Sequence, residues 1–329
     1  MSIDLHRQVA YAAVELGIAD AVSGIAAVGD VAASIEVSED ALTRLMRGMA
    51  HYGLCRDHGG GRFELTDAGT CLRTDCESDA ACDELRRFLD RGPATGMLAY
   101  SVRTGNPAFE HAFGMPFFEY TARDPAAGRR FSSLMAADTD TRAAAVAVGY
   151  DFSAVHRVVD VGGGHGALIT KILKHHPQLS SILFDVEAVV RQAERRIHQE
   201  GLAARCDLVA GDFFESVPSD GDLYLYSQIL HDWDDEECRT ILTTCRRAVG
   251  PGGKVLLVEA LMPERIERPQ PVVELDLMML MLTGGRERTC GEYRELLEQE
   301  GFQLTGVFPI DPNFSILEAT PATRPTEKV

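Results

Sequence analysis

RVVDVGGGHGA, residues 157–167, is the stretch that decides the fold of this chain. Five residues typical of a buried strand run directly into a glycine-rich turn, and a helical pattern follows the turn. Glycines let the backbone turn sharply and approach a ligand closely. The spacing Gly162-x-Gly164-x-x-Ala167 satisfies a dinucleotide fingerprint, and Asp185 lies 21 positions past Gly164, where a ribose diol would be bound. The stretch therefore predicts a site for an adenosine-bearing cofactor. By itself it does not separate NAD from S-adenosylmethionine.

Short apolar runs alternate with helical stretches throughout the rest of this half. Alternation of this kind predicts a parallel sheet that is covered on both faces, and right-handed crossovers make the sheet doubly wound. Two further apolar runs, 302–307 and 314–319, are so close together that they must pair antiparallel. The predicted parallel strands are residues 157–161, 182–185, 206–209, 223–226 and 254–259.

The first half of the chain reads as helical with one small hairpin. Residues 41–49 have helical apolar spacing, with Ser38 and Asp40 as candidate caps. Two extended runs, 55–57 and 62–65, flank a glycine-rich turn, and another helix starts at 66–69. This order is typical of a winged helix, which can bind DNA or serve as a dimerisation module.

Composition and charge argue against several classes of function. The formal net charge is −18 and the pI is about 4.9, whereas nucleic-acid binding and binding to anionic membranes both favour a basic surface. The eight cysteines form no C-x-x-C pair, so zinc-knuckle spacing is missing. The N-terminus lacks the pattern of a signal peptide, which predicts free thiols and a cytoplasmic location. The longest strongly apolar run, 277–282, is too short to span a bilayer.

Four more segments follow predicted strands or the apolar helix near the end of the chain. Gly211-Asp212-Phe213-Phe214 offers an acidic acceptor for an adenine amino group beside an aromatic face. Ligands of doubly wound sheets lie at the carboxyl ends of the strands, and the three segments that follow strands fall at such ends. The other segments are the run 227–235, which contains His231, Glu259 at the end of the fifth strand, and the run 284–289.

The ordered set D-V-G-G-G-x-G, G-D-F-F, L-H-D-W, V-E and G-G-x-E-R-T resembles the metal-independent small-molecule O-methyltransferases. These are the plant caffeate-type enzymes and their bacterial relatives in polyketide and antibiotic tailoring. The similarity spans nearly the whole chain. It implies an α/β fold with a Rossmann-like class I methyltransferase sheet and a mainly helical, winged-helix dimerisation domain. The expected divisions are a dimerisation domain at 1–95, a helical bridge at 96–150, an S-adenosylmethionine-binding catalytic domain at 151–320 and a loose tail at 321–329.

The resemblance also implies which residues bind the cofactor. The glycines of the loop would lie against the methionine part, Asp185 would take the ribose hydroxyls, and Asp212 with Phe213 would hold the adenine. The run Asp185-Val186-Glu187 departs from the more usual D-L-P, which affects only the local turn. The expected cofactor set is Asp160, Gly162, Gly163, Gly164, Asp185, Gly211, Asp212, Phe213, Ser227 and Gln228.

His231 would be the general base, with Asp232 as its neighbour and Glu259 and Glu287 flanking the imidazole. A phenol has a pKa near 10 and histidine one near 6.5, so the imidazole must take the proton as the new bond forms. A carboxylate beside the ring fixes its tautomer and stabilises its cation. No metal is expected, because the acidic pair 234–235 suits a helix cap. The candidate substrate-pocket residues are Phe117, Met135, Trp233, Met278 and Met281, and Met278 and Met281 could equally pack in a core or a dimer contact.

The predicted function is therefore methyl transfer from S-adenosylmethionine to a phenolic hydroxyl of a small aromatic metabolite in secondary metabolism. The enzyme is expected to be a homodimer. Three alternatives stay open. The acceptor could be nitrogen or carbon on the same fold. The chain could keep the cofactor and have lost methyl transfer. It could also be a winged-helix regulator, although its expected recognition helix carries only Arg44 and Arg47 as firm cations.

Overall fold

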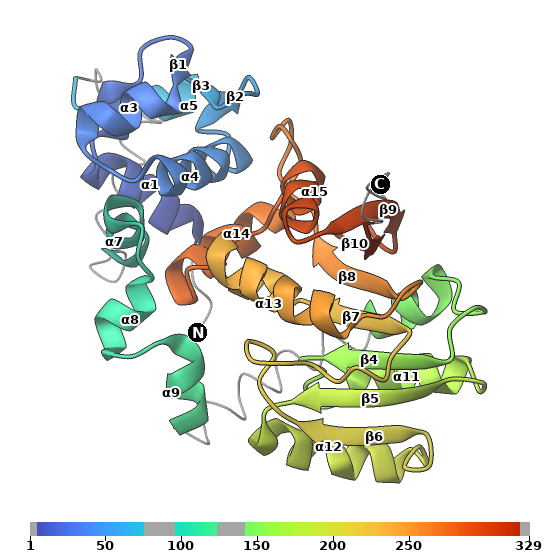
Figure 1. The fold of residues 1–329 in the computed structure, drawn as a ribbon. Helices are drawn as coiled ribbons and strands as arrows, with labels where there is room; N and C mark the ends of the chain where they lie inside the picture. Colours follow the sequence, from blue (N-terminus) through green and yellow to red (C-terminus); the bar gives the residue numbers. More distant parts are fainter. Residues whose placement is uncertain (1–4, 76–95, 124–141, 323–329) are drawn as a thin grey trace, which may run out of the picture. The chain divides into compact units, whose positions relative to one another are not determined.

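A computed structural model describes residues 5–75, 96–123 and 142–322 of the chain (Figure 1). The chain divides into two compact units. The first consists of Met1–Tyr120 with Met262–Glu287, and the second of Thr121–Leu261 with Arg288–Val329.

The second unit is built on a seven-stranded sheet in the order β6-β5-β4-β7-β8-β10-β9. Strands β4 to β8 pair parallel, and β10 pairs antiparallel with both β8 and β9. All seven predicted strands and the antiparallel pair are thus confirmed. The order reverses at β4, so the loops after β4 and β7 flank the switch point where doubly wound sheets bind ligands. The strands are β4 (Arg157–Val161), β5 (Ser180–Asp185), β6 (Cys206–Ala210), β7 (Leu223–Ser227), β8 (Lys254–Ala260), β9 (Phe302–Pro309) and β10 (Phe314–Pro321).

Side chains alternate between the two faces of this sheet, and each face has its own helices (Figure 1). Val158 and Leu183 belong to one apolar cluster, together with residues of helix 142–149, α11 (Ala167–His175) and α12 (Glu187–Gln199). Their strand neighbours Val159 and Ile182 belong to a second cluster, with residues of α13 (Asp235–Ala248) and α15 (Cys290–Gln299). The sheet is therefore doubly wound, as predicted.

The first unit is mainly helical and has a small sheet of order β1-β3-β2. The predicted hairpin is confirmed as β2 (Cys55–Asp57) and β3 (Arg62–Leu65), which pair antiparallel. Strand β1 (Ala26–Ala27) was not predicted, because two residues carry no period. Ser38 caps α4 as expected, whereas the winged-helix assignment stays a prediction. The helices are α1 (Leu5–Glu15), α2 (Ile18–Ala21), α3 (Val28–Ile35), α4 (Glu39–His51), α5 (Asp67–Thr70), α7 (Gly96–Thr104), α8 (Ala108–Phe113) and α14 (Pro271–Leu282), while α9 (Phe117–Arg123) runs across the unit boundary.

Helix α14 is part of the first unit although it lies far along the sequence. Leu277 and Met281 are buried in the same apolar cluster as the N-terminal helices. Asp276 forms a buried ion pair with Arg44 of α4, with 3.0 Å between Oδ2 and Nε. Nothing in the sequence pattern indicated this return. The domain boundaries expected at residues 95, 150 and 320 stay a prediction.

The sequence predicted a cytoplasmic location and free thiols. In the described part of the chain, no helix is both long and apolar enough to cross a membrane. The cytoplasmic location stays a prediction. Free thiols are confirmed at five cysteines, but Cys71 is disulfide-bonded, so that expectation was wrong there. The expectation of free thiols was based on the absence of an export signal, and that absence does not determine which cysteines the fold brings together. The free cysteines are Cys55, Cys206, Cys238, Cys245 and Cys290.

Candidate active site at the carboxyl edge of the sheet

The glycine loop after β4 folds back over the end of β5. Gly162 and Gly164 have φ values of 68° and 56°, in the left-handed region that glycine adopts without strain. The N–H groups of Gly162 and Gly163 donate to the carbonyl of Phe184, at 2.8 and 3.3 Å. The N–H of Gly164 donates to Asp185 Oδ2 at 2.9 Å. The loop is thus tied to the strand end where a ribose was expected.

Asp160 lies beneath this loop and is almost fully buried, with 2% of its surface exposed. Its Oδ2 atom has no hydrogen-bond partner among the described residues. A Cβ at Gly163 would come within 2.8 Å of that oxygen, so only glycine fits there without a shift. Burial, and then the charge of Asp185, raise the pKa of Asp160 to about 7. An unpaired buried carboxyl under a glycine loop suits a positively charged ligand.

Asp185 presents a partly satisfied carboxylate at the end of β5. Besides the bond from Gly164, its Oδ1 accepts the N–H of Val186 at 2.7 Å. Burial raises the pKa of Asp185, and these two backbone hydrogen bonds oppose that rise. Each carboxylate oxygen can accept more than one hydrogen bond. Asp185 therefore keeps accepting capacity for hydroxyl groups of a ligand.

The segment after β6 contributes a glycine, an acid and an aromatic ring. Gly211 donates its N–H to the Asp185 carbonyl at 3.0 Å, and a Cβ there would come within 2.5 Å of the Phe184 ring. Asp212 is exposed, and its Oδ1 accepts the N–H of Phe214 at 2.8 Å. Phe213 is half-buried beside it. The acid and the ring thus directly follow a glycine that is hydrogen-bonded to Asp185, an arrangement that suits an adenosine.

Gly162 brings three of the predicted segments together. A Cβ added there would lie 2.4 Å from Ile229 Cδ1 and 3.8 Å from Phe213 Cε1. The glycine loop, the segment after β6 and the segment after β7 therefore meet at one edge of the sheet. The predicted convergence of these motifs is what the fold produces.

His231 lies in a single 3₁₀ turn, Leu230–Asp232, directly after β7 and the linking residues 228–229. The side chain is buried, with its Nε2 3.7 Å from Asp232 Oδ1. Gln228 has a φ of 56°, which is uncommon for a residue with a side chain. Its Nε2 lies 3.5 Å from His231 Nδ1 and 3.3 Å from Glu259 Oε2. Backbone strain of this kind gathers at functional sites.

Glu259, at the end of β8, holds this turn from one side. The residue is fully buried, and its Oε1 accepts the N–H groups of Ile229 at 3.2 Å and Leu230 at 3.1 Å. Sequence reasoning predicted a carboxylate for the imidazole and did not foresee these backbone contacts. The strand register explains these contacts. Strand β8 pairs in parallel with β7, so Glu259 lies beside the residues that follow β7.

Arg288 holds the same turn from the other side, and sequence reasoning missed it as a site residue. Its Nη1 donates to the Leu230 carbonyl, and its Nη2 to the Trp233 carbonyl, both at 2.9 Å. The guanidinium also pairs with Asp235, with 2.7 Å between Nη2 and Oδ1. Its presence in the G-G-x-E-R-T motif was the available signal, but sequence reasoning considered it only as a possible ion-pair partner of Glu259.

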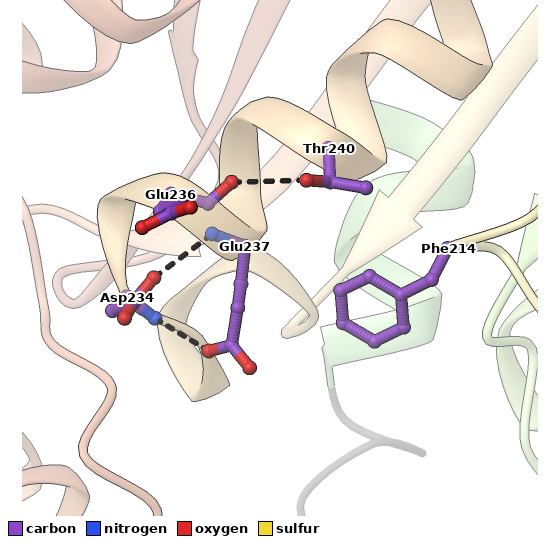
Figure 2. Close-up of a pocket in the computed structure, with 5 residues that line it drawn as sticks. All are labelled: Phe214, Asp234, Glu236, Glu237 and Thr240. Atoms are coloured by element: carbon purple, nitrogen blue, oxygen red, sulfur yellow. Dashed lines mark hydrogen bonds between the residues drawn. The ribbon is translucent and has the colours of Figure 1, made fainter.

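A surface hollow is lined by the start of α13, and Figure 2 shows the side chains of Asp234 and Glu237 there. Asp234 Oδ1 accepts the N–H of Glu237 at 2.8 Å, and Glu237 Oε2 accepts the N–H of Asp234 at 3.3 Å. This capping box starts α13, as predicted for the acidic pair, and so fixes its first residue, Asp235. The lining residues are Phe214, Asp234, Glu236, Glu237 and Thr240.

The other residues predicted for the site lie in several places. Ser227 is half-buried at the end of β7, and Trp233 packs edge-on against Phe214 at 4.8 Å between ring centroids. Glu287 is buried in the first unit, where its N–H donates to Asp276 Oδ1 at 3.0 Å.

The remaining candidates for the substrate pocket belong to the first unit or lie outside the described residues. Met281 is buried in the core of the first unit and Met278 packs against that core, which is the packing alternative raised for them. Phe117 lies 5.2 Å from Phe109 between ring centroids. Met135 lies outside the described residues.

Two known protein families match this chain. The family described as O-methyltransferase domain matches residues 96–303, and the O-methyltransferase dimerisation domain matches residues 5–75. The chain belongs to the O-methyltransferase family. This O-methyltransferase is 38% identical to phenazine O-methyltransferase PhzM of Lysobacter antibioticus, over 94% of this chain and 91% of the relative.

Two further matches bear on what the O-methyltransferase does. It resembles the solved structure of NcsB1, an O-methyltransferase from neocarzinostatin biosynthesis in complex with S-adenosyl-L-homocysteine and 1,4-dihydroxy-2-naphthoic acid. That match has a TM-score of 0.64 and 33% identity, and covers 96% of this chain and 95% of the other. It is also 35% identical to aclacinomycin 10-hydroxylase RdmB of Streptomyces purpurascens, over 85% of this chain and 78% of the relative. The O-methyltransferase is thus an S-adenosylmethionine-dependent transferase with a dimerisation domain.

Proposed function

We propose that this enzyme transfers the methyl group of S-adenosylmethionine to a phenolic hydroxyl of a small aromatic metabolite, in the biosynthesis of an antibiotic or related natural product. The observation that carries the proposal is the contact of Gly162 with Ile229, which sets the cofactor loop against the turn that bears His231. Relatives that methylate phenazine or naphthoate compounds support an aromatic acceptor.

The cofactor would lie along the glycine loop and the ends of β5 to β7. The loop would lie against the methionine part on the side of Gly164, where an added Cβ would meet no atom within 4 Å, whereas Gly162 and Gly163 pack closely against protein atoms. Asp160 would face the positively charged end, Asp185 the ribose, and Asp212, Phe213 and Gly211 the adenine. Ser227 and Gln228 would line the opposite side. When bound, the cofactor supplies an electrophilic methyl group on a sulfonium.

The imidazole of His231 would accept the proton of the hydroxyl as the oxygen attacks. The pKa mismatch between a phenol and histidine means that the two events are concerted. Glu287 directly precedes Arg288, and Arg288 is bonded to the carbonyl of Leu230, which directly precedes His231. Glu287 would supply a further carboxylate to the imidazole, as the resemblance to the family implies. Glu259 and Asp232 would stabilise the turn and the imidazolium.

The alternatives fare differently. RdmB is a relative named as a hydroxylase, so loss of methyl transfer is a real competitor. The regulator is disfavoured, because Arg44, one of the two cations on the expected recognition helix, is buried against Asp276.

The dimerisation domain supports a homodimer formed through the N-terminal unit, which light scattering would test.

The decisive experiment is transfer of labelled methyl from S-adenosylmethionine to a panel of phenols with one to three fused rings. We expect a labelled methyl ether, and we expect a chelator to leave its yield unchanged, because the proposed base is an imidazole. His231→Ala should lower turnover by about 10²- to 10⁴-fold and leave cofactor affinity nearly intact. His156→Ala, an exposed histidine before β4, is the matched control. Label on nitrogen or carbon, or unchanged turnover in His231→Ala, would refute the corresponding part.

A further inference from the structure

We infer that Arg288 is a positioning residue for methyl transfer: its guanidinium fixes the turn that presents His231. The inference rests on the proposed role of His231 as the base. It concerns a residue that does not itself touch the reacting atoms.

The first step is the geometry of the guanidinium. Arg288 is among the largest fully buried side chains of the chain. Its Nη1 donates to the carbonyl of Leu230, the residue before His231, and its Nη2 to the carbonyl of Trp233, two residues after it. One rigid planar group therefore binds the backbone carbonyls on either side of His231 and Asp232. Lysine has the charge but lacks this fork.

The second step is the ion pair that holds the guanidinium in place. Asp235 Oδ1 accepts from Nε at 3.0 Å and from Nη2 at 2.7 Å. Asp235 opens α13, and the capping box of Asp234 and Glu237 fixes that helix start. The guanidinium is thus anchored to the rigid end of a helix, and not to a mobile loop.

The third step is the peptide unit of Leu230 itself. Glu259 accepts its N–H at 3.1 Å, and Arg288 donates to its carbonyl at 2.9 Å. The residue that precedes His231 is therefore held at both of its backbone polar groups, and the direction in which the imidazole leaves the chain is set. A misplacement of about 1 Å in a reacting group can lower the rate about 10²-fold.

Arg288→Lys tests this inference in the full-length enzyme. We expect turnover to fall by about 10²-fold, while KM for the phenol and the Kd for S-adenosylmethionine change by less than about 3-fold. In Arg288→Ala, added guanidinium at millimolar concentration should restore part of the turnover, and sodium chloride at the same ionic strength should not. A purely structural loss would give no such rescue.

Two further variants keep the test decisive if Arg288 variants fold poorly. Asp235→Asn leaves Arg288 in place and removes its anchor, so turnover should fall with cofactor affinity retained. Arg246→Lys is the control, because Arg246 also donates to a backbone carbonyl, that of Gly301, away from the site. Wild-type turnover in both Arg288→Lys and Asp235→Asn overturns the inference. If His231→Ala also keeps turnover, the proposed function fails instead.

Discussion

Glu259 Oε1 accepts a hydrogen bond from the backbone N–H of Leu230 at 3.1 Å, so a carboxylate at the end of one strand fixes the residue that precedes His231. The same oxygen accepts the N–H of Ile229. The buried carboxyl group therefore accepts from the two backbone N–H groups that lie just before His231.

Glu259→Gln should lower turnover by about 10- to 100-fold with little change in cofactor affinity. Glutamine can still accept the two backbone bonds through its oxygen. Its amide group would then face the amide nitrogen of Gln228, which now lies 3.3 Å from Glu259 Oε2, and two donors repel. Steady-state kinetics checks this, with Glu236→Gln on the exposed start of α13 as the control. Unchanged kinetics would mean that the turn does not depend on this charge.

Gly162→Ala should weaken cofactor binding by at least about 10-fold and lower the free energy of unfolding by about 1–2 kcal/mol. The residue has a φ of 68°, and its new Cβ would lie 2.4 Å from Ile229 Cδ1. Calorimetric titration with S-adenosylmethionine and denaturant unfolding measure the two effects. Gly250→Ala is the matched control, because a Cβ at Gly250 meets nothing within 4 Å. Equal affinity of the two variants would place the cofactor elsewhere.

Asp185→Ala should raise the Kd for S-adenosylmethionine by about 10- to 100-fold, since hydrogen bonds to a charged group contribute about 1.5–3 kcal/mol. The variant also removes the acceptor that holds the N–H of Gly164. Calorimetry measures this Kd. The control is Asp207→Ala, near the amino end of β6, which should bind S-adenosylmethionine with normal affinity. Wild-type affinity in Asp185→Ala would refute the ribose assignment.

Asp160→Asn should change how stability depends on pH. The pKa of Asp160 is about 7 in the folded protein and about 3.9 in an unfolded chain, so the folded state holds an extra proton between these values. The free energy of unfolding therefore falls as pH rises through this window. The variant lacks that fall, so at pH 8 it should be more stable than the wild type by about 1–3 kcal/mol, and near pH 4 equal to it.

Denaturant unfolding of both proteins between pH 4 and pH 8 measures this difference. Asp220→Asn, at an exposed position, should follow the wild-type curve. Parallel curves for Asp160→Asn and the wild type would show that Asp160 is ionised throughout this range.

The sequence alone determined the catalytic sheet and the segments of its site. Short apolar runs between helical stretches located all seven strands, because a parallel strand that is buried on both faces has a continuous apolar run. The parallel order then placed Asp160, Asp185 and His231 at one edge, since ligand-bearing loops follow the carboxyl ends of the strands. The positions of the strands and of these residues could be predicted from local sequence patterns and from the right-handedness of the crossovers.

Only the tertiary structure decided which distant groups hold one another. The return of α14 to the first unit depends on Asp276 meeting Arg44 across 232 positions of sequence, which no local pattern encodes. The clamp on the His231 turn likewise joins Leu230 to Glu259 and to Arg288, 29 and 58 positions away. A side chain's hydrogen-bond partner is set by register and packing, and the identity of the residue fixes only what it can donate or accept.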